Sequence, residues 1–309
     1  MLKAIWLGLG LAFIWGSNFP LSQIGIEQIG SIPYRLATII ISTVILISLS
    51  FNELKTYLKK LSLNDCIFIT LLAIPNIFLV PLINNISLAY LSITKATILV
   101  YIMPCFVSIM VMISEKKSNV ISVVATLLCL SGITVLSGLK GFSFGESLMV
   151  LNAFIWAIGA FMSKKIKLDH IPMRVVVCIQ MIITLLMTLV TSLIWGQIDT
   201  SIMNGFSFNT LMKMPVILSV LYVGAIGSAL AYYLWFTLIK LKSAEFTSYA
   251  TLLSPVISIV MAVTLFNEEL KVTTMIGGTL ILLSSCMIII KPLFEHQNKT
   301  YSGLKRKIS

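Results

Sequence analysis

Apolar stretches follow one another along nearly the whole chain, and each is about as long as the ~20-residue helix that crosses a bilayer. Backbone groups in hydrocarbon must find hydrogen-bond partners within their own segment, which favours helices. We therefore predict an all-α integral membrane protein. The ten expected transmembrane helices span residues 4–24, 33–51, 66–87, 94–114, 119–138, 145–163, 174–195, 214–238, 244–266 and 272–291.

The composition supports lipid as the solvent. Hydrophobic residues make up 58% of the 309-residue chain and charged residues 11%, with a mean hydropathy of +1.02. A soluble domain has roughly 25% charged residues. The apolar runs are too continuous for the alternating pattern of a transmembrane β-barrel. Ten spans with short loops also leave no room for a sizeable soluble domain.

The basic residues predict the orientation of the chain. With the N-terminus inside, 17 of the 22 Lys and Arg residues fall on the cytoplasmic side. The five on or near the other side are Arg35, Lys95, Lys140, Lys213 and Lys271. The positive-inside rule favours this topology, so we expect both termini to be cytoplasmic. The net charge of +11 then reports topology, and we expect no nucleic-acid partner.

Two segments repeat one helix-turn-helix pattern. Residues 243–289 resemble residues 93–136, with Pro104 matching Pro255 and Glu115 matching Glu268 after a two-residue gap. The first spans of the two halves share the motif Ala-Phe-Ile-Trp, which ends at Trp15 and at Trp156. Such duplication predicts two copies of one structural unit. Because each copy has five spans, an odd number, the second copy is inverted in the membrane.

We therefore divide the chain into a first repeat at 4–138, a second, inverted repeat at 145–291 and a basic cytoplasmic tail at 292–309. The third span of each repeat carries helix-disrupting residues, Pro75 and Pro81 in one and Gly224 and Gly227 in the other. Inverted repeats with broken helices are common in secondary transporters, whose substrate site lies between the halves near the midplane.

The candidate substrate-binding residues are polar, aromatic or proline residues within the spans. Aromatic rings can line a pocket, amides are costly in lipid, and prolines free backbone carbonyls. Each feature also has a structural explanation: interfacial anchoring or packing for the aromatics, a static kink for the prolines, and local backbone bonding for the hydroxyls. The candidates are Trp15, Asn18, Arg35, Asn76, Asn84, Tyr101, Pro104, Trp156, Tyr232, Thr251, Ser254 and Pro255.

Ionisable and metal-binding residues are sparse. No Asp or Glu falls in the middle third of any predicted span, so we expect a neutral or zwitterionic substrate. Arg35 lies near the external end of the second span, where it would either attract a carboxylate or snorkel to the surface. His170 and His296 have no ligand-spaced Cys or carboxylate, the five cysteines lack CxxC spacing, and no Walker loop occurs. These patterns predict no metal, no cofactor and no enzymatic activity.

The motifs resemble the twin EamA domains of the drug/metabolite transporter superfamily. The matching pieces are Trp15-Gly16-Ser17-Asn18-Phe19, Arg35, Pro104 with Glu115, and Ser254-Pro255 with Glu268 followed by Gly277. The similarity covers about 4–138 and 145–290. It implies a ten-helix transporter of small metabolites in the inner or plasma membrane, in a family that includes many exporters of amino acids and related compounds.

We expect a secondary transporter that exports amino acids or related compounds by alternating access, as a monomer or homodimer in the cell (inner) membrane. Its partners would be a small-molecule substrate and the lipid bilayer. The nearest alternative is a multidrug or lipophilic-cation efflux carrier. A membrane-embedded lipid-modifying enzyme would need clustered Asp, His or Arg, whereas the acids here are scattered. A channel or an assembly subunit is a third possibility, which inverted duplication disfavours.

Overall fold

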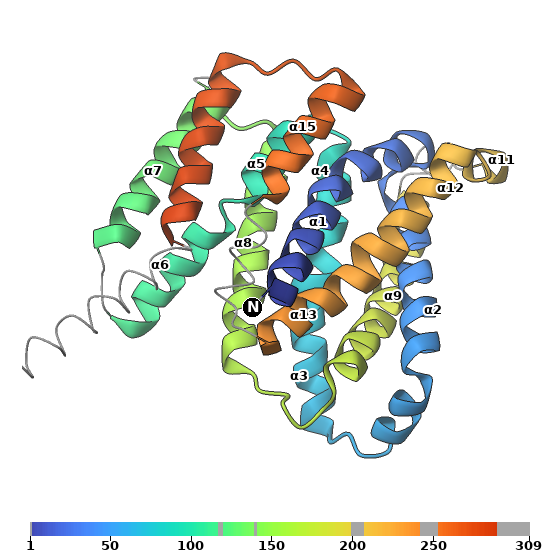
Figure 1. Cartoon of the computed structure of the whole chain (residues 1–309). Coiled ribbons are helices and arrows are strands. Elements are labelled where there is room, and N and C mark those ends of the chain that lie inside the picture. The colour runs from blue at the N-terminus through green and yellow to red at the C-terminus, as the bar shows by residue number, and fades with distance from the viewer. Residues whose placement is uncertain (1, 117–119, 139–140, 199–206, 242–252, 289–309) are drawn as a thin grey trace, which may run out of the picture.

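The computed structural model describes residues 2–116, 120–138, 141–198, 207–241 and 253–288 (Figure 1). These residues form helices joined by short turns, with no β-strand among them. Thr251, the start of the predicted ninth span, the end of the tenth span and the basic tail lie outside the described residues.

The helices follow one another in the order of the predicted spans. The first repeat contains α1 (Leu2–Ile29), α2 (Ser31–Leu58), α3 (Leu63–Ala73), η1 (Ile74–Leu79), α4 (Val80–Leu88), α5 (Ile93–Val100), α6 (Met103–Glu115) and α7 (Val120–Ser137). The second contains α8 (Phe144–Lys165), α9 (Met173–Ile198), α11 (Phe208–Leu211), α12 (Met214–Leu221), η2 (Tyr222–Leu230), α13 (Ala231–Leu241), α15 (Ser254–Phe266) and a final helix, Val272–Ile288.

Length and hydropathy mark seven of the described helical segments as able to cross a membrane, and α15 and Val272–Ile288 are shorter apolar helices. The outward faces carry large exposed apolar side chains such as Leu49, Ile113 and Leu193, each at least 69% exposed. In water such surfaces would drive aggregation, whereas lipid tails cover them at no cost. The fold is therefore that of an all-helical, multi-pass membrane protein. The count of ten crossings and the cytoplasmic position of both termini stay predictions.

The interruption expected in the third span is confirmed in both repeats. Each takes the form of a π-helical segment, η1 around Pro75 and η2 around Gly224 and Gly227. A π-helical turn inserts one extra residue and often marks a functional site. The fourth span differs from expectation: it is not one kinked helix but two helices, α5 and α6, separated at Tyr101 and Ile102. Pro104 lies in the first turn of α6, where its missing N–H has no helical partner to lose.

The turns after α6 and α15 correct the alignment of the two repeats. Both helices have 13 residues with proline in the second position, and each is followed by a residue with positive φ, Lys116 at 51° and Asn267 at 52°. Glu115 therefore ends its helix, as Phe266 does, whereas Glu268 lies beyond the turn. The two glutamates are not structurally equivalent, and the predicted two-residue gap at this turn is wrong.

The arrangement of the repeats follows from a few close crossings (Figure 1). On one side of the molecule, α7 packs on Val272–Ile288 where the facing glycines Gly132 and Gly277 let the backbones touch. The core surrounding Leu99, Ile102 and Met149 draws side chains from both repeats. A second core fills the space between α2 and α9 around Ile39 and Met181. The first spans of the two repeats, α1 and α8, lie between these two cores.

Candidate functional site

The first span of each repeat packs on the opposite repeat. Helix α1 contacts α12, η2, α13 and α15 of the second repeat, whereas α8 contacts η1, α4, α5 and α6 of the first. Both sets comprise the broken third span and the proline-containing fourth span of the other half. The crossing of α1 with α15 is close because Gly16 leaves room for the Ser254 carbonyl and for Ile257. The two halves are thus interlocked reciprocally about α1 and α8.

Four aromatic rings meet where α1, α8 and α13 come together. The ring centroids of Trp15 and Trp156 are 6.3 Å apart, and those of Trp15 and Tyr232 are 6.4 Å apart, both in edge-to-face arrangements. Trp235 is also close, with its ring centroid 5.0 Å from that of Trp15. Edge-to-face contacts of this kind are attractive beyond their apolar burial. Three of the candidate residues therefore do lie together, and Trp235, an aromatic residue outside the candidate list, is the fourth member of the cluster.

Next to these rings, two Asn–Gly pairs join the halves. Asn18 lies against Gly227 of η2, where an added Cβ would be 2.2 Å from Asn18 Oδ1. Asn76 of η1 lies against Gly159 of α8, where an added Cβ would be 2.4 Å from Asn76 Oδ1. Asn18 and Gly159 each follow their repeat's tryptophan by three residues. The two pairs therefore occupy equivalent positions in the repeats. In one pair the asparagine is on the first span and the glycine on the third span, and in the other pair the two residues are reversed.

The π-helical segment η1 exposes carbonyls that other spans use. Pro81 has no N–H, so the carbonyls four and five residues before it, of Ile77 and Asn76, lose a helical donor. Arg35 donates from Nη2 to the Ile77 oxygen at 2.6 Å, and the Tyr232 hydroxyl donates to the Asn76 oxygen at 3.0 Å. Arg35 is 3% exposed. It does not snorkel to the surface, so that explanation for it is wrong.

The remaining candidates lie on the same helices but have other partners. Asn84 of α4 accepts a hydrogen bond from Asn152 Nδ2 of α8, and Asn152 is fully buried. The Tyr101 carbonyl, left at the break between α5 and α6, accepts from Ser285 Oγ of the final helix. Pro104, Ser254 and Pro255 are buried in the first turns of α6 and α15. A hydrogen bond of 2.8 Å between Thr97 and Ser258 links α5 to α15.

One end of the helix bundle is closed by charged groups. Glu268 accepts from the backbone N–H groups of Ile93 and Thr94, at 2.6 and 3.1 Å, and so caps α5 of the other repeat. Lys95 pairs with the buried Glu146 at 2.7 Å. A carboxylate at a helix N-terminus satisfies donors that lack helical partners and complements the helix dipole. These groups line a polar cavity of about 690 Å³, on the side that the topology prediction places outside.

The opposite end also joins the repeats, through one ion pair and one contact between a histidine and a carboxylate. Arg174 pairs with Glu53 at 2.9 Å, and His170 Nε2 lies 2.9 Å from Asp65 Oδ1. Sequence reasoning missed both contacts and the Glu146 pair, since their partners are 51 to 121 residues apart in the chain. The residues Ser143-Phe-Gly-Glu146 have the Ser-x-x-Glu pattern of a capping box, and the structure forms one there. Nothing local indicated its lysine partner.

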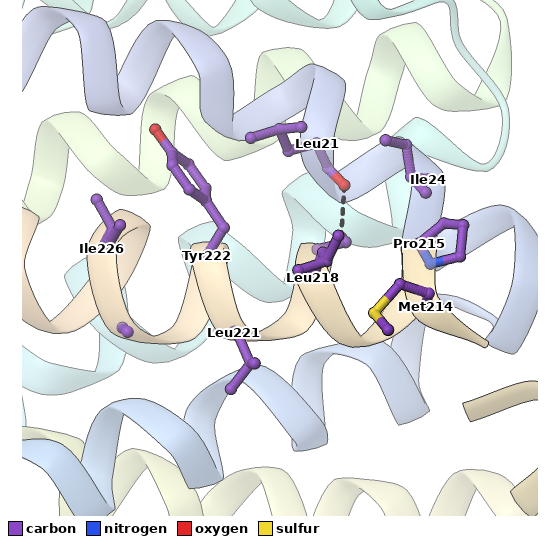
Figure 2. Close-up of a pocket in the computed structure, with 10 residues that line it drawn as sticks. Leu21, Ile24, Met214, Pro215, Leu218, Leu221, Tyr222 and Ile226 are labelled. Atoms are coloured by element: carbon purple, nitrogen blue, oxygen red, sulfur yellow. Dashed lines mark hydrogen bonds between the residues drawn. The ribbon is translucent and has the colours of Figure 1, made fainter. Parts of the chain in front are cut away.

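A separate groove of about 710 Å³ lies between α1 and the helices α12 and η2 (Figure 2). Its lining is almost wholly apolar and contains none of the four clustered aromatic residues. Ser219, which also lines the groove, donates from Oγ to the Leu21 carbonyl at 2.6 Å. An open, apolar surface without free polar groups suits contact with lipid tails. We therefore place the candidate site at the aromatic and Asn–Gly contacts, not in this groove.

Taken with the fold, this geometry defines a class: a multi-pass helical membrane protein built from two interlocked repeats. The model of the EamA-like transporter family matches residues 2–138 and 143–290 of the chain. The protein belongs to the EamA-like transporter family, which confirms the resemblance read from the sequence motifs.

Relatives that match the chain over most of their length are named as transporters. A protein of Archaeoglobus fulgidus named "Uncharacterized transporter" is 24% identical over 86% of this chain and 90% of its own. The Bacillus subtilis "Uncharacterized transporter YvbV" is 26% identical, with 91% and 90% covered. A solved crystal structure superposes with a TM-score of 0.61 at 17% identity, covering 92% of this chain and 96% of that one, and so shares the fold.

Proposed function

We propose that this membrane transporter is a secondary carrier that exports a small metabolite, an amino acid or a related compound, by alternating access. The observation that carries the proposal is the reciprocal interlock of the two repeats, in which Trp15 and Trp156 meet at the centre. In a carrier built from inverted repeats, the second half can adopt the conformation of the first, and this exchange opens the site to the opposite side.

The proposed substrate site lies around the aromatic rings and the two Asn–Gly pairs. Trp15, Trp156 and Tyr232 would contact the apolar part of the substrate, and Asn18 and Asn76 would supply hydrogen bonds. Asn18 already has a buried side-chain oxygen with no partner, which a substrate N–H would satisfy. Asn84, Tyr101, Pro104, Ser254 and Pro255 would shape the moving contacts of the broken spans, with Thr251 as a further proposed contact.

Efflux of a lipophilic cation is the second candidate. The observation that favours it is the four-ring cluster of Trp15, Trp156, Tyr232 and Trp235, because aromatic rings attract cations through their faces. We propose the cell membrane as the location and a cytoplasmic position for both termini, on the strength of the lysine distribution.

The test is counterflow in proteoliposomes loaded with a panel of L-amino acids, and in parallel with tetraphenylphosphonium. An exporter of amino acids gives saturable, trans-stimulated uptake of at least one labelled amino acid. We expect Trp15→Ala and Asn18→Ala to reduce that exchange by about tenfold or more, as loss of a buried contact does. Gly10→Ala is the matched control on the same helix, since an added Cβ at Gly10 meets nothing within 4 Å.

Flux that does not saturate and shows no trans-stimulation would indicate a channel. Exchange of tetraphenylphosphonium alone would select the efflux alternative. Unchanged exchange in both variants would show that the substrate site lies elsewhere.

A further inference from the structure

Arg35 is a buried cation without an anionic partner. It is 3% exposed, and none of the ion pairs among the described residues includes it. Its Nη2 donates to the Ile77 carbonyl, while its Nε is buried and has no hydrogen-bond partner. A charge in this environment is strongly disfavoured unless a counter-charge completes it, and an ionisable residue inside a membrane bundle indicates a functional site.

The contacts of Arg35 hold it in place without neutralising it. One carbonyl oxygen fixes one edge of the planar guanidinium, and that carbonyl is available because Pro81 lacks an N–H. A guanidinium presents several donors in a rigid fork that matches the two oxygens of a carboxylate. With Nη2 fixed and Nε unsatisfied, the side chain is preorganised for a second, anionic acceptor.

The neighbouring groups connect Arg35 to the proposed substrate site. Tyr232 donates to the carbonyl of Asn76, the residue next to the one that Arg35 contacts, and its ring lies against Trp15. Arg35, Asn76 and Ile77 belong to the first repeat, whereas Tyr232 belongs to the second. In alternating access the two repeats would move relative to each other, the Tyr232–Asn76 bond between them would separate, and Arg35 would then open to the space beside the rings.

We propose that Arg35 binds the carboxylate group of the substrate, and that substrates of this transporter must therefore carry a free carboxylate. The inference rests on the proposed transport function and narrows it, because it excludes amines, amides and lipophilic cations. A purely structural Arg35 would brace η1 and have no influence on which compounds bind.

The test uses phenylacetate and its neutral analogue phenylacetamide as probes, with the purified chain in lipid nanodiscs and thermal unfolding as the readout. We expect saturable stabilisation of the wild type by phenylacetate and none by phenylacetamide. Arg35→Gln should weaken phenylacetate binding ~30-fold or more, the cost of removing one partner of a buried charged pair. Arg35→Lys keeps the charge but loses the planar guanidinium, so its affinity for phenylacetate should lie between those of the wild type and of Arg35→Gln. Arg174→Gln is the control, since that arginine is a solvent-exposed partner of Glu53.

Two outcomes overturn the inference. One is equal binding of both probes, or of neither, by the wild type. The other is an Arg35→Gln variant that unfolds at a lower temperature yet retains the wild-type preference for phenylacetate. Counterflow separates this failure from that of the proposed function: exchange of amino acids and of their amides at equal rates leaves a transporter without a carboxylate requirement. Absence of all exchange would instead reject the carrier.

Discussion

The broken third spans of the two repeats reach the same backbone geometry with opposite residues. In the first repeat, Pro75 lies within η1 and Pro81 follows its end by two residues, and in the second, η2 contains Gly224 and Gly227. Prolines remove donors and so leave carbonyls for other spans to use. Glycines remove side chains and so leave room for other spans to enter.

This difference explains which groups each repeat contributes at the centre. The proline version attracts Arg35 and Tyr232 to its free carbonyls. The glycine version admits Ile41 beside Gly224 and Asn18 beside Gly227. One repeat therefore supplies polar backbone atoms and the other supplies space. The two segments occupy equivalent positions in the duplicated halves, yet one offers free carbonyls and the other offers room for neighbouring side chains.

The largest expected effect comes from filling the space at Gly224. A Cβ there would lie 2.8 Å from Ile41 Cβ and 2.9 Å from the Thr38 carbonyl, which belongs to helix backbone and cannot rotate away. We expect Gly224→Ala to lower the free energy of unfolding by about 3 kcal/mol, at the upper end for overpacking. Unfolding of the detergent-solubilised protein measures it, with Gly10→Ala as a control expected to change stability by less than about 1 kcal/mol. Equal effects at both glycines would show that the close α2–η2 contact is not required.

Exchanging the residues of one Asn–Gly pair is a sharper test. Gly227→Asn places a second amide against Asn18, and we expect it to cost about 2 kcal/mol. The double variant Asn18→Gly with Gly227→Asn reproduces the arrangement that Asn76 and Gly159 already have. It should recover about 1 kcal/mol or more, as contacting residues show coupling of that size. A double-mutant cycle in the same unfolding assay gives the coupling energy. Additive effects would contradict the reciprocal interlock.

The cap on the fourth span of the first repeat extends the comparison to one end of the bundle. Glu268 of the second repeat caps α5 of the first through two backbone N–H groups. We expect Glu268→Gln to reduce stability by about 1 kcal/mol, the typical cost of losing an N-cap. Glu269→Gln removes the same charge one residue away and serves as the control. If both variants lost equal stability, the effect would come from net charge and not from the cap.

Restoring the missing donor in η1 should change stability least. Pro81→Ala supplies an N–H that can bond to the Asn76 or Ile77 carbonyl in place of Tyr232 or Arg35. Because one hydrogen bond replaces another, we expect a change of less than about 1 kcal/mol in the unfolding free energy. Substrate exchange should nevertheless fall, since the carbonyl that positions Arg35 is now occupied. Unchanged exchange kinetics in counterflow would show that Pro81 has no part in the site.

Much of the fold could be predicted because lipid imposes strict rules on a chain. The apolar runs gave the helices, and the interruptions at Pro81 and Gly227 were visible in the sequence, as was the equivalence of Trp15 and Trp156. The break at Tyr101 was missed because proline marks a kink and a helix start equally well. The Glu115–Glu268 match failed because residue identity outweighed turn geometry, which places a left-handed residue at Lys116 and at Asn267.

The site was harder to predict, since its key contacts join residues distant in the chain. Tyr232 and Asn76 are 156 residues apart, and no local sequence pattern predicts the hydrogen bond between them. Gly159 and Gly227 carry no side chain, so their partners appear only once the helices are packed. Arg35 illustrates the same point: its position near a span end was compatible with snorkelling as well as with function, and its burial against the Ile77 carbonyl excludes the snorkelling.

In the proposed mechanism the two interlocked repeats alternate about α1 and α8, and the distances between pairs of spin labels report this motion. In a chain with its five cysteines replaced, one label pair at Tyr90 and Leu270 reports on the Glu268 end, and another at Lys59 and Asp169 reports on the opposite end. Pulsed electron paramagnetic resonance in nanodiscs then gives both distance distributions with and without a transported amino acid. Alternating access predicts opposite changes, one end widening as the other narrows. Distances that stay constant at both ends, or that widen together, would contradict the account.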